Sequence, residues 1–189
     1  MKRKHSQRGS ALLETVLVFP VLIGVTLLAA DLYNLHQARS YMEQSAHTIA
    51  SVLGVQSTLD NNGVQALVER ATSMNRTPFE LIISKVESDR SMNWRPLYRG
   101  EVQGVCERHS AGSRFTGAFP EALRADDEQT LSNVPVVVVQ VCATVDALAL
   151  SYALLGSDKI EVQAISRLQH GTPTLDDVLT RELDPQEDE

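Results

Sequence analysis

Gly9, Ser10 and Glu14 have a spacing that could support chemistry near the start of the chain. A cut after Gly9 would leave Ser10 as a new, cationic N-terminus. Glu14 follows four residues later, about one helical turn, so its carboxylate could pair with that amine within one chain or between neighbours. The pairing would offset a charge that costs about 2.5–3.5 kcal/mol inside a membrane on insertion scales. The simpler alternative is a carboxyl group near the membrane edge that reaches water or stays protonated.

Cys106 and Cys142 are the two cysteines of the chain. In an oxidising compartment such a pair is most simply a disulfide, and closing a loop of that size contributes roughly 4 kcal/mol. A zinc site is the alternative, because Cys106 and His109 stand three residues apart. It lacks a second close pair of ligands, so we expect the disulfide and no metal.

Motifs of catalysis are missing from the sequence, which contains no Walker-type loop, no GxSxG elbow and no HExxH. Ser110 and Ser113 lie near His109 and Asp126 in the sequence, but this proximity does not make a catalytic triad. We therefore expect no enzymatic activity, no catalytic residue and no cofactor. A hydrolase built around residues 107–133 is a remote alternative.

Residues 10–30 are the element that must position Glu14. This almost wholly apolar run is long enough for a helix that crosses a bilayer. Basic residues precede it and are absent for some distance after it, which predicts a cytoplasmic N-terminus and a C-terminal domain outside the inner membrane. The basic residues of the leader are Lys2, Arg3, Lys4 and Arg8.

A cleaved secretory signal is the alternative reading of the same stretch, because it also combines a basic start with an apolar core. Cleavage next to Ala29 or Ala30 would need a small residue two positions upstream. Leu27 and Leu28 occupy those positions, which argues against such a signal.

The string from Arg8 to Glu14, followed by Thr15 to Pro20 and more apolar sequence, resembles the processing site of type IV prepilins. More broadly, residues 8–53 resemble the TadE/TadF family of minor pseudopilins from the tight-adherence (Tad) pilus. The resemblance implies that a prepilin peptidase cuts between Gly9 and Ser10 and that Glu14 pairs with a neighbour's N-terminal amine during assembly. It also implies three partners: the inner membrane, the peptidase and other pilus-assembly subunits.

The length, composition and net charge of the chain limit how many domains it can form and which partners it can bind. With 189 residues, of which 43% are hydrophobic, the chain can hold one membrane helix and one modest domain. The formal net charge is −7, and removing residues 1–9 with their four basic side chains would leave −11. An acidic mature protein argues against nucleic acid as a partner.

Beyond the apolar run a narrow seam of small and apolar residues continues at helical spacing, which predicts one helix over 10–53. The seam could face the protein's own sheet or a neighbouring subunit. Gly54 is placed to end the helix in a left-handed conformation, and a second helix is predicted over 63–74 with Asn62 as its cap. The seam comprises Leu35, Ala38, Met42, Ser45, Ile49 and Val52.

The second half of the chain reads as β-structure. We expect a hairpin of Phe79–Glu87 with Met92–Tyr98, a central strand at Val136–Val141 and a last strand over 160–168. Trp94 is expected to anchor the core. Residues 107–133 read as a long loop with a helical turn near 121–124, and a short helix is predicted over 147–155.

The predicted fold class is α+β: a long N-terminal transmembrane helix that continues into a pilin-like periplasmic domain with an antiparallel sheet. We divide the chain into a leader (1–9), a membrane helix (10–30), a periplasmic domain (31–170) and an acidic, flexible tail (171–189). Within the tail, Thr174 and Asp177 could cap a short helix.

The predicted function is assembly of a Tad-type adhesive pilus from the inner membrane. The alternative is an uncleaved single-pass anchor whose periplasmic domain binds a ligand or an envelope partner. TadE and TadF types are not distinguished by these residues.

Overall fold

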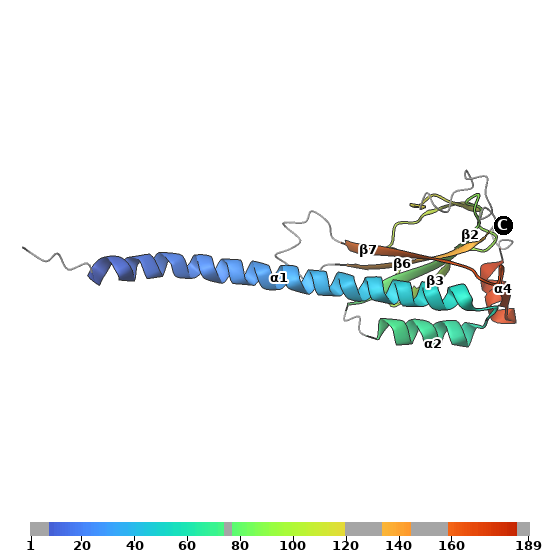
Figure 1. Ribbon diagram of the computed structural model, residues 1–189, viewed down its shortest axis with the longest axis horizontal. Coiled ribbons are helices and arrows are strands. Elements are labelled where there is room, and N and C mark those ends of the chain that lie inside the picture. The colour runs from blue at the N-terminus through green and yellow to red at the C-terminus, as the bar shows by residue number, and fades with distance from the viewer. Residues whose placement is uncertain (1–7, 74–76, 120–133, 145–158, 185–189) are drawn as a thin grey trace, which may run out of the picture.

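A single long helix dominates the computed structural model, which describes residues 8–73, 77–119, 134–144 and 159–184. This helix, α1, spans Arg8–Val55 and has 48 residues (Figure 1). At 1.5 Å per residue it is about 72 Å long, more than twice the thickness of a hydrocarbon core. The prediction of one continuous helix over 10–53 is confirmed, and Pro20 lies within it.

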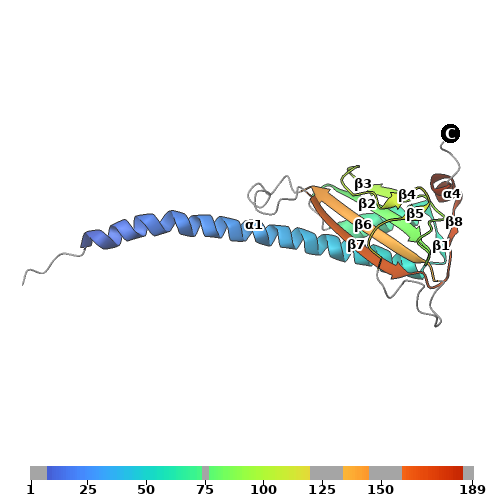
Figure 2. The ribbon, with the colours of Figure 1, turned by 90° about the horizontal axis from the view of Figure 1, so that it is seen from above.

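The C-terminal half of α1 packs on the protein's own sheet, whereas its N-terminal half extends away from the domain (Figures 1 and 2). From the predicted seam, Met42, Ser45 and Ile49 are buried. They are joined by Ala46, Ala50 and Leu53, which also lie in the main core. Of the two partners considered for the seam, the structure therefore selects the chain's own sheet.

Gly54 does not end α1 in a left-handed conformation, so that prediction is wrong. The helix continues to Val55, and Gly54 is absent from the glycines with positive φ. A Cβ at this position would lie 2.5 Å from Ser166 Oγ and 2.8 Å from the Arg167 carbonyl oxygen. Glycine is needed here because the end of the helix lies so close to the strand that contains Ser166.

The second helix, α2, spans Asn61–Thr72 and confirms the helix predicted over 63–74. Its N-cap is Asp60 and not Asn62, because the Asp60 side chain accepts a hydrogen bond from the Gly63 amide. The Ser45 hydroxyl donates to the Ala71 carbonyl at 2.9 Å, so the end of α2 lies beside α1 about ten residues before the C-terminal end of α1. The two helices are therefore antiparallel, as Figure 1 shows.

A four-stranded antiparallel sheet covers the two helices (Figure 2). Its strands in spatial order are β3 (Leu97–Gly100), β2 (Phe79–Val86), β6 (Val136–Thr144) and β7 (Lys159–Arg167). The central, doubly covered strand predicted over 136–141 is confirmed, because Val137, Val139 and Val141 join the main core while Val136 and Val138 join a second core on the other face. With the long helix, this sheet confirms the α+β class.

The hairpin partner of β2 starts later than predicted. The strand is Leu97–Gly100 and not Met92–Tyr98. Pro96 has no amide to donate to a sheet, and Met92 instead packs in the second core. Trp94 is partly buried against the main core, as expected.

The segment predicted as a long loop contains structure in its described part, 107–119. Two short strands, β4 (Ser110–Ala111) and β5 (Arg114–Phe115), pair there. Phe115 and Phe119 are buried in the second core, so this segment covers the outer face of the sheet. The helical turn predicted near 121–124 and the helix predicted over 147–155 lie outside the described residues.

The prediction of a flexible tail over 171–189 is wrong for residues 174–183. Strand β8 (Thr174–Leu175) pairs in parallel with β1 (Thr58–Leu59), and helix α4 spans Asp177–Leu183. Leu179 and Leu183 are buried in the main core. The error has a physical cause: these leucines, four residues apart, share one helical face whose burial outweighs the high charge density. The helix cap is Asp176, not Thr174.

Candidate functional site

Gly9, Ser10 and Glu14 lie together in the first two turns of α1, which begins at Arg8. The helix therefore supplies the one-turn spacing between residues 10 and 14 that pairing requires. The Glu14 side chain is exposed and borders a shallow groove along α1 with Thr15, Val18, Phe19 and Leu22. The groove is a surface on which another helix could pack.

The turns of α1 that follow Glu14 expose large apolar side chains on every face. Leaving this much apolar surface in water would be strongly unfavourable. Within the described part of the chain, Glu14–Val55 is the helix long and apolar enough to cross a membrane. The exposed residues include Val16, Leu17, Phe19, Val21, Leu22, Val25 and Leu27.

The described part of the domain lies far from Glu14. The helix becomes buried only at Met42, which is about 40 Å from Glu14 along the axis. The basic side chains in the described part of the domain are therefore too far away to pair with this carboxylate.

Cys106 and Cys142 form the predicted disulfide, with their Cα atoms 5.2 Å apart. It joins the segment after β3 to the central strand β6. Glu80, which is buried in β2, accepts hydrogen bonds from the amides of Val105 (2.6 Å) and Cys106 (2.7 Å) and so positions this segment. Because the sulfur of Cys106 is bonded to Cys142, it is not a thiolate that could bind zinc with His109.

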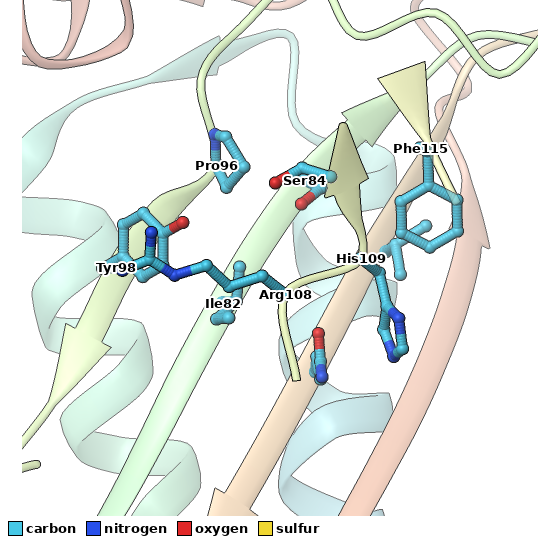
Figure 3. A pocket seen from close by; sticks show the side chains of 10 residues that line it. Ile82, Ser84, Pro96, Tyr98, Arg108, His109 and Phe115 are labelled. Atoms are coloured by element: carbon cyan, nitrogen blue, oxygen red, sulfur yellow. The ribbon is translucent and has the colours of Figure 1, made fainter. Parts of the chain in front are cut away.

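Of the residues considered for a hydrolase, His109 and Ser110 border a small hollow on the outer face of the sheet (Figure 3), and Ser113 does not. His109 Nε2 lies 3.1 Å from Glu161 Oε1, and the same oxygen accepts a hydrogen bond from Gln140. Ser110 borders the hollow, and Figure 3 shows Arg108 extending toward Tyr98. About one water molecule fits between these side chains, far less than a substrate pocket requires. Asp126 lies outside the described residues.

Two structural charges in β2 were not singled out from the sequence. Besides Glu80, the buried Lys85 donates to Glu87 at 2.7 Å and to Thr172 at 2.8 Å, and lies 5.4 Å from the centre of the Trp94 ring. The available signal was their position in an otherwise apolar strand, where a charge needs a partner.

Comparison with known proteins identifies the N-terminal segment. Residues 9–51 match the model of the TadE-like protein family. The match begins at Gly9 and covers most of α1, so it confirms the resemblance inferred from the sequence over this helix. None of the curated proteins and none of the solved structures matches the chain.

Proposed function

We propose that this protein, which is TadE-like over residues 9–51, is a membrane-anchored minor pseudopilin that acts in assembly of a Tad-type adhesive pilus. One observation carries the proposal: Gly9, Ser10 and Glu14 occupy the start of a helix whose following turns are apolar and exposed. The family match begins at the same glycine.

Insertion would place the basic leader in the cytoplasm of a bacterium, α1 across the inner membrane and the sheet domain in the periplasm. The positive-inside rule supports this orientation. The disulfide supports it as well, because such bonds persist in the periplasm and are rare in the cytosol.

Processing by a prepilin peptidase would hydrolyse the peptide bond between Gly9 and Ser10. Water adds to the Gly9 carbonyl carbon, the leader leaves with a carboxylate, and Ser10 keeps a protonated amine. The Glu14 carboxylate of a neighbouring subunit then pairs with that amine inside the membrane, where leaving either charge alone is costly. The chain is thus a substrate and a building element, with no catalytic role of its own.

Processing is tested by co-expression with a prepilin peptidase and N-terminal sequencing of the mature protein. We expect Ser10 as the first residue, and a full-length chain for Gly9→Leu. Gly24→Leu makes the same exchange in an open position of α1 and should still be cut. A wild-type chain that keeps Met1, or is cut elsewhere, would contradict the proposal and favour the uncleaved anchor that binds a ligand or envelope partner.

The assembly role is tested separately with Glu14→Gln. This variant should insert and be cut normally, because the exchange leaves the Gly9–Ser10 bond unchanged. It should lower the amount of surface pili, measured by shearing and immunoblotting. Glu43→Gln, an exposed acid in the periplasmic half of α1, is the control. Normal piliation by Glu14→Gln would remove Glu14 from the mechanism.

A further inference from the structure

Asn62 and Gly63 form the one Asn–Gly pair of the sequence, and both lie in the first turn of α2. In such a pair the backbone nitrogen of the glycine can attack the side-chain carbonyl carbon of the asparagine, because no side chain shields that nitrogen and the glycine backbone is permissive. Both residues are exposed to water. The pair is therefore a candidate site of covalent modification, independent of the processing and assembly roles proposed above.

The modification is loss of the Asn62 side-chain amide, and solvent water is its only co-reactant. The Gly63 nitrogen gives its proton to hydroxide and bonds to Asn62 Cγ, while the Cγ–Nδ2 bond breaks and ammonia leaves. Water then adds to either carbonyl of the resulting succinimide and opens the ring. The product at residue 62 is aspartate, or isoaspartate when the main chain runs through the former side chain.

The N-cap of α2 opposes this reaction. The Gly63 amide donates to Asp60 Oδ1 at 2.7 Å, and the Val64 amide donates to the Asp60 carbonyl at 3.0 Å. Ring closure requires the Gly63 nitrogen to leave this arrangement and to lose the proton that Asp60 accepts. Capping and ring closure therefore compete for the same N–H group.

A carboxylate from the other end of the domain holds the same turn of α2. Asp176, the N-cap of α4, accepts a hydrogen bond from the Asn61 amide at 2.9 Å. Arg99 of β3 donates to Asn61 Oδ1 at 2.8 Å and to the Glu182 carboxylate of α4 at 2.7 and 3.0 Å. Helix α4 is thus joined, directly and through Arg99, to the residue that precedes Asn62.

We propose that Asn62 is a deamidation site that reacts when the first turn of α2 opens, and that Asp60 and the docked helix α4 keep this turn closed. Helix ends open locally more often than the whole domain unfolds. The rate of ammonia loss is then the open fraction multiplied by the rate of ring closure in the open chain. Removing either carboxylate raises the open fraction and hence the rate.

Isoaspartate at residue 62 would make the opening permanent. The main chain between residues 62 and 63 gains a methylene group, so the Gly63 amide no longer meets Asp60 in the geometry of a helix cap. Asn61, to which α4 is joined, is displaced with it. Trypsin should therefore cut after Arg181 of α4 sooner in aged protein than in fresh protein, and equal cleavage would contradict this release of α4.

Ageing of the purified full-length protein in detergent at mildly alkaline pH tests the site. Peptide mapping by mass spectrometry measures aspartate and isoaspartate at residue 62 over time. Asp60→Ala should convert about fivefold faster than the wild type, as expected for loss of a typical N-cap. Asp60→Ser, which restores a capping side chain without the charge, should return to the wild-type rate. The wild-type chain in denaturant gives the rate of the open segment and should be the fastest.

Asp176→Ala tests the connection to α4, because Asp176 bonds to Asn61 and not to the reacting pair. It should also convert faster than the wild type, by a similar factor. Asp177→Ala, at the exposed neighbouring position, should keep the wild-type rate. Asn62→Gln should stay unmodified at residue 62, because the longer side chain closes a less favourable ring.

Several results would overturn the proposal. Equal rates in the wild type, Asp60→Ala and the denatured chain would show that the cap gives no protection. Conversion of Asn34 or Asn93 before Asn62 would put the site elsewhere, and an unchanged rate in Asp176→Ala would exclude the role of α4. Circular dichroism before ageing establishes that each variant is folded, and if Asp60→Ala is not, Asp176→Ala decides the outcome.

Discussion

At the scale of single residues, two buried charges in β2 tie the sheet to distant parts of the chain. Glu80 accepts from the amides of the segment that carries Cys106, and Lys85 donates to Thr172 beyond the last strand of the sheet. A buried charge is tolerated when its hydrogen bonds are satisfied, and its loss leaves the partner groups unpaired. These side chains therefore act as connectors between segments.

Replacing Glu80 tests this role. Glu80→Ala leaves the Val105 and Cys106 amides without their acceptor, and the free energy of unfolding should fall by about 2 kcal/mol. The Cys106 segment would lose its anchor, so disulfide formation should also be slower after reduction. Denaturant unfolding and thiol labelling during reoxidation measure the two effects. Glu107→Ala, an exposed acid in the same segment, should change neither.

At the scale of elements, the contact between α1 and β7 depends on the absence of a side chain at residue 54. Gly54→Ala would force the helix end away from Ser166 and Arg167 and should lower the free energy of unfolding by about 1–3 kcal/mol. Gly24→Ala is the matched control, because a Cβ there meets nothing within 4 Å. Thermal unfolding in detergent compares the two. Equal midpoints would contradict the close approach at Gly54.

The stability of helix α4 should depend on pH through its N-cap residue, Asp176. Hydrogen bonds from the amides of Asn61 and Leu179 lower the pKa of Asp176 below its ordinary value. A lowered pKa in the folded state stabilises α4 above the pKa of the unfolded carboxyl, about 3.9, and this contribution is lost as the pH falls through the folded value. The thermal midpoint should therefore fall on acidification below about pH 4.

The Asp176→Ala variant should have a lower midpoint near neutral pH and a smaller drop on acidification than the wild type. Asp177→Asn, the next residue and an exposed one, should retain the wild-type profile. If Asp176→Ala and the wild type lose the same amount between neutral and acidic pH, the cap does not carry the pH dependence.

At the scale of the whole molecule, we expect the disulfide to stabilise the sheet domain without affecting the membrane insertion of α1. Cys106 and Cys142 are 36 residues apart, and the loop-entropy model assigns such a bond about 4 kcal/mol. The double variant Cys106→Ser with Cys142→Ser should unfold at lower denaturant concentration, yet still resist carbonate extraction. Reductant should have no further effect on it. A double variant as stable as the wild type would contradict this stabilising role.

How much could be predicted from the sequence differs between the two halves of the molecule. The structure of the N-terminal half could be predicted because the sequence patterns that specify it are local. An apolar run, a basic leader and the spacing of Gly9, Ser10 and Glu14 lie on consecutive turns, so periodicity and length were enough to predict the helix over 10–53. The central strand could be predicted from its run of consecutive apolar residues, and the disulfide from the presence of two cysteines in the chain.

Tertiary structure decided what depends on contacts between distant residues. Charge density predicted a free tail, but the burial of Leu179 and Leu183 against the core makes it helix α4. Gly54 looked like a helix terminator, but its role is to allow close approach of a strand more than 100 residues away in the sequence. The sequence by itself thus determined the long helix and the one-turn spacing of Ser10 and Glu14 at its start. Which face of that helix the sheet covers was set by packing between segments that no local pattern describes.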